Sequence, residues 1–230
     1  MSNLNQHKPG YKHTPLGWIP EEWHVLPLME LSKNGLSNGA FNDPRKVGSG
    51  FRLINVLDLY KEPCIDTSVL PRLALTEKEF KNNKVLKGDI FFTRSSIKLE
   101  GIAYCNINLE DADDITYDGH IMKLSPNDEI VLPEYLRLYC ISYRARKFFM
   151  SRAKFNTMTT IGQDDISDMP VLVPSKQEQR KIAAILSAWD EAITKTQQLI
   201  AQLQQRNKGL MQQLLTGEKR LKGFQGEWKT

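Results

Sequence analysis

The chain has 230 residues, a hydrophobic content of 40% and a net charge of +4. These values are ordinary for a folded protein with one globular domain and a long appendage. No apolar run approaches the roughly 18 residues of a membrane span, and the chain starts without a signal-peptide pattern. We therefore expect a cytoplasmic protein with no membrane partner and three reduced thiols, at Cys64, Cys105 and Cys140.

The positive charge is concentrated near the end of the chain. Residues 175–230 hold 10 Lys and Arg against 5 Asp and Glu, whereas residues 1–174 hold 21 against 22. The larger segment is therefore close to neutral, which excludes a generic polyanion-binding domain. Any contact with nucleic acid has to come from local loops, or a partner has to neutralise many of the phosphates.

In chain order, residues 1–16 predict a flexible lead-in and residues 17–174 predict a mixed α/β (α+β) domain. Residues 32–50 are rich in Ser, Asn and Gly and predict a loop. A turn and a strand are predicted at 85–94. Further strands are predicted at 51–59, 102–107, 121–124 and 169–173, helices at 76–83 and 133–152, and a polar loop at 153–165.

Residues 175–216 predict one long helix without an internal proline. Ser175 and Glu178 have the spacing of a capping box, and Gly217 is placed to end the helix. At 1.5 Å per residue the helix is a rod of roughly 60 Å.

Apolar residues on this helix alternate at spacings of four and three, which is the 3.5-residue period of a coiled coil. One helix cannot bury such a seam alone, so we expect a dimer interface; the alternative is a helix packed along its own domain. The a positions are Leu186, Ile193, Ile200, Asn207 and Leu214, and the d positions are Ile182, Trp189, Thr196, Leu203 and Leu210.

The final segment, 217–230, is expected to be a tail or the start of a second repeat. Its string GFQGEW at 223–228 is similar to GWIPEEW at 17–23, with a leading glycine, two aromatic residues and a Glu-Trp ending. This similarity predicts that the chain is one repeat of a two-repeat protein.

Motifs of enzymes are missing. The sequence has no G-x-x-x-x-G-K-[ST] nucleotide loop, no H-E-x-x-H and no Asn/Asp-Pro-Pro-aromatic string that could hold a target base. Its four histidines are scattered, and Asp111, Asp113 and Asp114 are interpreted as a solvated loop. We expect no catalytic residue, no metal site and no cofactor bound by this chain.

Three polar segments carry side chains that can bond DNA bases and phosphates without forming acid–base pairs. In the segment 93–98, Arg94 can bond guanine bidentately; the alternative is a surface turn with a salt-bridged arginine. The candidate DNA-binding residues are Asn42, Arg45, Lys46, Thr93, Arg94, Ser95, Ser96, Lys98, Lys154, Asn156, Thr157, Thr159 and Thr160.

Several strings resemble the specificity subunits of type I restriction–modification enzymes. The most specific are PSKQEQRKIAAILSAWDEAI at 174–193 and QQLLTGEKRL at 212–221. GWIPEEW, GDIFFTRSS at 88–96 and DGHIMKL at 118–124 are similar to the target recognition domain of that family. The family's full-length subunit has two such domains and two such helices, so the resemblance implies a half-length form that works as a homodimer.

The resemblance also implies a function without chemistry of its own. The chain would choose the site on double-stranded DNA for a methyltransferase subunit that uses S-adenosylmethionine and for a restriction subunit that uses ATP and Mg²⁺. The family's helices run antiparallel, which predicts an interrupted palindrome as the target and a layer that pairs Trp189 with Asn207 of the second chain. A parallel pair, a coiled-coil adaptor without DNA binding, and a catalytic DNA methyltransferase or nuclease are the alternatives.

Overall fold

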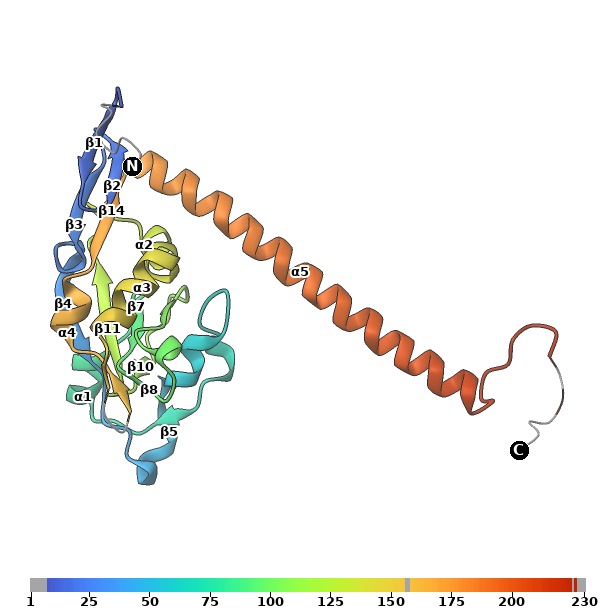
Figure 1. Cartoon of the computed structure of the whole chain (residues 1–230). Coiled ribbons are helices and arrows are strands. Elements are labelled where there is room, and N and C mark those ends of the chain that lie inside the picture. Colours follow the sequence, from blue (N-terminus) through green and yellow to red (C-terminus); the bar gives the residue numbers. More distant parts are fainter. Residues whose placement is uncertain (1–7, 156–157, 225, 227–230) are drawn as a thin grey trace. The chain divides into compact units, whose positions relative to one another are not determined.

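The computed structural model describes residues 8–155, 158–224 and 226 (Figure 1). Two compact units divide the chain, Met1–Ala184 and Ile185–Thr230. The first is a mixed α/β domain, and the long helix α5 (Lys176–Leu215) begins in it and continues into the second. The predicted fold class, a mixed domain followed by one long helix, is confirmed.

An antiparallel sheet of four strands forms the centre of the domain, in the order β4-β11-β7-β9. Its strand β7 is buried on both faces, because Phe92 packs into one hydrophobic cluster and Phe91 into another, as the two-residue period of a strand requires. The bounds are β4 (Ser32–Asn38), β7 (Ile90–Thr93), β9 (Cys105–Ile107) and β11 (Ile121–Pro126).

Smaller sheets surround this centre. β10 runs parallel to β5, which pairs antiparallel with β6; the remaining pairs, β1 with β2, β14 with β3, and β13 with β12 and β8, are antiparallel. The bounds are β1 (Tyr11–Thr14), β2 (Gly17–Pro20), β3 (His24–Pro27), β5 (Val47–Ile54), β6 (Arg72–Leu73), β8 (Ser95–Ser96), β10 (Ile115–Tyr117), β12 (Lys154–Phe155), β13 (Thr159–Thr160) and β14 (Pro170–Val173).

Helices cover the larger hydrophobic cluster, where the ring of Phe149 meets that of Phe92 edge to face at 5.9 Å. α2 and α3 contribute most of this cover, and α2 contacts β9. The α-helices of the domain are α1 (Glu77–Asn83), α2 (Pro133–Ile141), α3 (Tyr143–Arg152) and α4 (Gln163–Ser167), and the short 3-10 turns are η1 (Leu28–Leu31), η2 (Pro44–Lys46), η3 (Val56–Tyr60), η4 (Thr67–Val69) and η5 (Leu99–Gly101). None of the described helices is long and apolar enough to cross a bilayer.

Six expectations about the elements were wrong. The strand expected at 102–107 begins at Cys105, and the polar loop expected at 153–165 contains β12, β13 and the first residues of α4. The lead-in is partly ordered, because residues 11–14 form β1. The expected loop at 32–50 contains β4 and the first part of β5; β4 lies at the edge of its sheet, where polar side chains can face solvent. The strand expected at 51–59 ends at residue 54. The helix expected at 133–152 is broken at Ser142, whose backbone is extended and whose Oγ accepts from Ala145 N at 3.4 Å.

The start of α5 is tied to the domain. Ser175 and Glu178 form the predicted capping box, and the Trp23 indole donates to Glu178 Oε1 at 3.2 Å. Gln179 is fully buried: its Nε2 donates to the carbonyls of Ile130 and Pro174 at 3.1 and 2.9 Å, and its Oε1 accepts from Leu132 N at 2.8 Å. Because all three bonds would leave buried polar atoms unpaired if broken, Gln179 holds the first turns of α5 to the domain.

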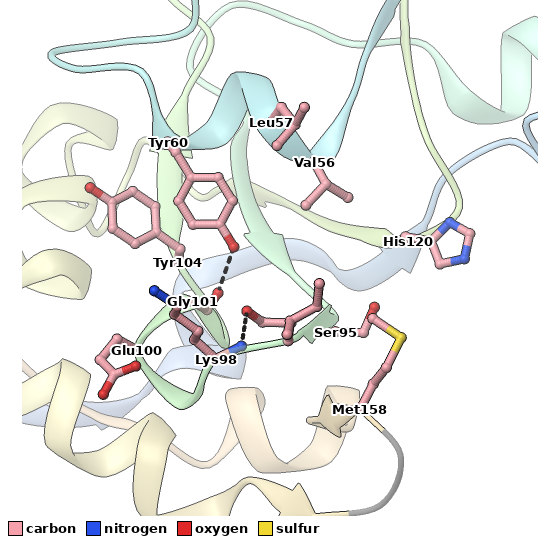
Figure 2. A pocket seen from close by; sticks show the side chains of 12 residues that line it. Val56, Leu57, Tyr60, Ser95, Lys98, Glu100, Gly101, Tyr104, His120 and Met158 are labelled. Atoms are coloured by element: carbon pink, nitrogen blue, oxygen red, sulfur yellow. Dashed lines mark hydrogen bonds between the residues drawn. The ribbon is translucent and has the colours of Figure 1, made fainter.

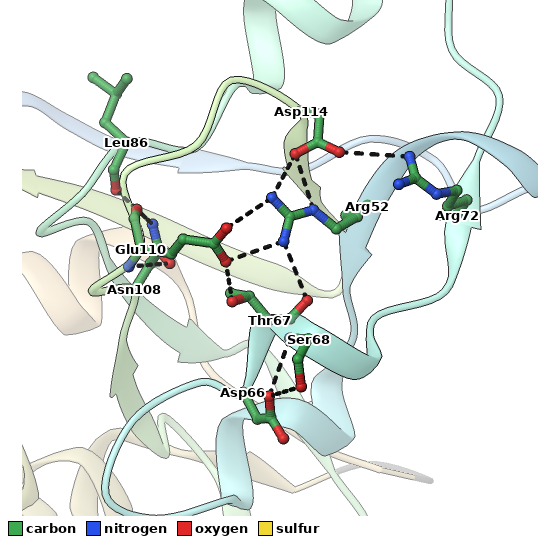
Figure 3. A network of polar contacts seen from close by, with 9 residues as sticks. All are labelled: Arg52, Asp66, Thr67, Ser68, Arg72, Leu86, Asn108, Glu110 and Asp114. Atoms are coloured by element: carbon green, nitrogen blue, oxygen red, sulfur yellow. Dashed lines mark hydrogen bonds and ion pairs between the residues drawn. The ribbon is translucent and has the colours of Figure 1, made fainter.

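A network around Arg52 joins β5 to the loop before β10 (Figure 3). The Arg52 guanidinium donates to both oxygens of Glu110 at 3.0 Å and to Asp114, and Thr67 also donates to Glu110. These bonds from Arg52 lower the pKa of Glu110 and of Asp114 below their ordinary values.

Replacing Arg52 with Met should therefore cost stability in a pH-dependent way. A carboxylate with a lowered folded pKa contributes stability above its unfolded pKa of about 4, and that contribution is lost as the pH falls through the folded value. We expect R52M to lower the free energy of unfolding by about 2 kcal/mol at pH 7, and the gap from wild type to narrow as the pH falls below about 4.

Thermal melts of both proteins from pH 7 to pH 3 measure this gap. Arg72→Met is the matched control, because Arg72 contacts Asp114 at 3.5 Å with about half of its side chain exposed; it should cost less than about 1 kcal/mol. A gap that stays constant with pH would show that Arg52 stabilises the fold by packing alone.

Candidate nucleic-acid interface

Two of the three predicted recognition segments are joined in one small sheet. β8 pairs with β13, with Ser95 opposite Thr160 and Ser96 opposite Thr159, and β13 pairs in turn with β12. Segments about 60 residues apart in the sequence are thereby brought side by side.

Arg94 lies immediately before β8, and its backbone is held from two sides. Its N–H donates to His120 O at 3.0 Å, and its carbonyl accepts from Ile161 N at 3.1 Å. The side chain is exposed. A fixed backbone with an exposed guanidinium suits bidentate recognition, because the donor fork needs little ordering on binding.

A polar hollow of about 470 Å³ opens beside Arg94. Lys154, from β12, is exposed and lies 3.4 Å from Asp165. The hollow offers donors and acceptors that can reach base edges or phosphates. Its lining residues are Asn38, Arg94, Met122, Lys154, Thr160, Ile161, Gly162 and Gln163.

A second, larger groove of about 700 Å³ lies along β8 and η5 (Figure 2). Ser95, Ser96 and Lys98 line it from the predicted segment, and Met158 lines it from the segment that leads into β13. The predicted residues therefore form part of its wall, but the rest of the lining comes from η3, from η5 and from Tyr104 and His120, which were not among the predicted contact residues.

His120 connects this groove to a third hollow, of about 510 Å³, whose lining includes Asn55 and Asp118. Its imidazole is largely exposed, and its Nδ1 lies 2.8 Å from Oδ1 of the buried Asp118 carboxylate. That contact orients the ring. Only the string DGH pointed toward this residue, and its position beside Arg94 comes from the sheet pairing of distant segments.

Two predicted contact residues face inward instead. Thr93 is fully buried; its Oγ1 donates to Gly101 O at 2.6 Å and accepts from Tyr104 N at 2.9 Å. Thr159 is buried as well. Because both side chains are buried, neither forms part of the exposed surface. Asn156 and Thr157 lie outside the described residues.

The third predicted segment, around η2, is not joined to the sheet of β8 and β13. Arg45 donates to both carboxylate oxygens of Asp43, at 3.0 and 2.7 Å, and these bonds lower the pKa of Asp43. Lys46 lies 3.9 Å from Glu79, and Asn42 donates to Asn55 Oδ1 at 3.4 Å. Arg45 is therefore a salt-bridged arginine in a surface turn. That arrangement was the alternative considered for Arg94.

The predicted seam of α5 divides into ends that contact their own unit and a middle that does not bury its side chains. Ile182 packs against the domain's larger hydrophobic cluster, and Leu214 lines a hollow with residues 219–224. Between them the seam is exposed, with Trp189 66% and Ile193 53% accessible. The other exposed seam residues are Leu186, Thr196, Ile200, Leu203, Asn207 and Leu210.

The apolar surface of α5 is wider than the predicted seam. Ile185 and Leu199 each precede an a position, and both are more than half exposed. Neither residue belongs to the predicted seam, because the seam comprises only the a and d positions of each heptad.

Known proteins match both the sequence and the fold. The family described as "Type I restriction modification DNA specificity domain" matches residues 20–205. The candidate MjaX specificity subunit of a type I restriction enzyme from Methanocaldococcus jannaschii is 26% identical over 211 residues, which are 90% of this chain and 48% of that protein. The HindI specificity subunit from Haemophilus influenzae is 30% identical over 123 residues, 53% of this chain and 26% of that protein.

A crystal structure of the HsdS subunit from Thermoanaerobacter tengcongensis has the same fold, with a TM-score of 0.61 and 18% identity. The match covers 91% of this chain and 52% of that one, so the chain spans about half the length of MjaX and HsdS. Because the family match extends over most of the domain and most of α5, the chain belongs to the family of type I restriction modification DNA specificity domains.

Proposed function

We propose that this chain is a sequence-specific DNA-recognition subunit of a type I restriction–modification complex. The observation that carries the proposal is the pairing of β8 with β13, which sets the exposed Arg94 beside Lys154, Thr160 and Gln163 at one hollow. Family membership supports it independently.

The side chains on this surface favour recognition of DNA over catalysis. Arginine reads guanine O6 and N7 bidentately, and the hydroxyl, amide and ammonium groups around it reach bases or phosphates. The domain's near-neutral charge leaves much of the phosphate neutralisation to other subunits. The revised contact set is Arg94, Ser95, Ser96, Lys98, Lys154 and Thr160, with His120 added; Asn42, Arg45 and Lys46 remain candidates for flanking phosphates.

Two copies of the chain would associate through α5. Its middle exposes an apolar seam that a second helix can bury. In an antiparallel pair each a position faces a d position, so Trp189 meets Asn207 of the second chain and Ile193 meets Leu203. A bulky indole against a small amide fills one layer, and the indole N–H can donate to the amide oxygen.

A two-fold dimer presents two copies of one recognition surface, so it would bind two inverted half-sites separated by a spacer. The chain itself would carry out no chemistry. A methyltransferase subunit with S-adenosylmethionine would modify the chosen site, and a restriction subunit that uses ATP and Mg²⁺ would cleave unmodified DNA.

Arg94→Ala tests the recognition surface. Loss of a bidentate contact to guanine should weaken binding of the specific site by about 1–3 kcal/mol, or relax the choice of one base pair. The measurement is binding of target and scrambled duplexes, together with methylation by the partner methyltransferase with and without this chain. R45A is the comparison variant: Arg45 is exposed but paired with Asp43, so as a candidate phosphate contact it should weaken target and scrambled duplexes alike and leave site choice unchanged.

Three outcomes would contradict the proposal in different ways. If R94A selects the same DNA site as wild type, Arg94 does not contact a base. Methylation that needs the chain but shows no preference for sequence would favour the coiled-coil adaptor. Turnover by the purified chain alone would favour a catalytic enzyme.

Charges placed in the seam test the dimer. In the proposed register position 193 of one chain faces position 203 of the other, so Ile193→Glu with Leu203→Glu places two carboxylates against each other. We expect monomers by light scattering, with domains that remain folded by circular dichroism. Gln198→Glu with Gln205→Glu adds the same charges on the opposite side of the helix and should leave the dimer intact. Dimers of the seam variant would contradict the assigned interface.

Cysteines at the same two positions determine the direction of the helices. In the antiparallel register, a chain with both Ile193→Cys and Leu203→Cys should cross-link under mild oxidation, whereas either change alone should not. Cross-linking by each single variant would instead show a parallel pair, which brings each residue against its own copy.

A further inference from the structure

The groove along β8 exposes large apolar side chains on a surface that we assign to DNA. Ile97 is 89% accessible and Leu57 is 75% accessible, and both line the groove with Val56 and Met158. Apolar side chains gathered in one groove provide a surface that a ligand with an apolar group can cover.

The wall of the groove is held in place before any ligand binds. The Tyr60 hydroxyl donates to Gly101 O at 3.1 Å, and Lys98 N donates to Ser96 Oγ at 3.2 Å (Figure 2). Gly101 itself lies under Ser96 and Tyr60, because a Cβ there would meet both side chains. A preformed apolar wall loses little conformational entropy when a ligand is buried against it.

The position of the groove narrows the choice of occupant. Ile97 directly follows β8, and Arg94 directly precedes it, so the apolar groove continues the polar hollow along one strand. Lys98 lines the groove, and Lys61 lines the hollow that adjoins it at His120. Lys61 is paired with Asp58 at 2.8 Å, and Glu100 lines the groove together with Lys98, so the charges of the lining are balanced. DNA is therefore favoured as the occupant by the position of the groove, along the same strand that Arg94 precedes.

Within the major groove of DNA, thymine alone among the four bases presents an apolar group, its C5-methyl. We propose that the groove lined by Leu57, Ile97 and Met158 binds thymine methyl groups, and so reads A·T pairs in the half-site next to the pair bound by Arg94. This inference rests on the proposed DNA-recognition function and adds the chemical class of base that this surface selects.

Deoxyuridine tests the inference, because it removes only the methyl group and keeps every hydrogen-bonding atom of thymine. After the target site is mapped, each thymine of a half-site is replaced singly, and binding of the full chain with its methyltransferase partner is measured. At one thymine or more we expect about fourfold weaker binding, the equivalent of about 0.8 kcal/mol for one buried carbon.

The variant Ile97→Ala should weaken binding of unmodified DNA, and deoxyuridine at the sensitive position should then cost little more, because both changes remove the same contact. Leu57→Ala is a second variant with the same expectation. Val69→Ala is the matched control: Val69 is 63% accessible in η4, does not line the groove, and should leave the full deoxyuridine effect.

Two outcomes would overturn the inference while leaving specific binding intact. In the first, deoxyuridine changes the affinity at none of the thymines. In the second, deoxyuridine has an equal effect in wild type, I97A and L57A. A half-site without an A·T pair would overturn it too. If I97A binds the methyltransferase subunit more weakly but binds DNA with unchanged affinity, the groove binds a protein partner instead. Failure of the wild-type chain to distinguish target from scrambled DNA would instead contradict the proposed function itself.

Discussion

The exposed apolar seam of α5 is the constraint on which the proposed assembly depends. The helix has 40 residues, and beyond Ala184 its apolar side chains recur every three or four positions without being buried by their own unit. Burying apolar surface is favourable by about 25 cal/mol per Å², so a second helix is the natural partner. A second copy of the chain would supply that helix and impose two-fold symmetry, from which inverted half-sites follow.

The domain contributes the other half of the proposal. The proposed recognition surface depends on backbone pairing between β8 and β13, which aligns Ser95 with Thr160, while the neighbouring Arg94 side chain is exposed. Gln179 then links the domain to the first turns of α5 through three buried hydrogen bonds. In this arrangement the residues that would read DNA and those that would bind the second chain belong to separate parts of one protein.

Features that depend on local sequence were predictable. The capping box of Ser175 and Glu178 and the heptad spacing predict α5. Short apolar runs predict β7 and β14. Arg94 could be named as a candidate from the sequence, because an arginine beside serines follows a buried strand; its contact with DNA stays a prediction.

Features that depend on contacts between distant segments could not be predicted from the sequence. β4 is a strand because β11 pairs with it, although its own composition is typical of a loop. Thr93 and Thr159 resemble their exposed neighbours in sequence, and only the packing of other strands buries them. His120 and the apolar groove become visible only when η3, β8 and the segment before β13 are brought together.

The most direct measurement is a map of methylated sites in cells that carry this chain and its methyltransferase partner, made with the native helix and with seven residues inserted at its middle. We expect two inverted copies of one half-site, and a longer spacer with the insertion, because seven helical residues add about 10 Å. An asymmetric site, or a half-site that changes when the helix is lengthened, would contradict a two-fold dimer whose helix sets the distance between two DNA contacts.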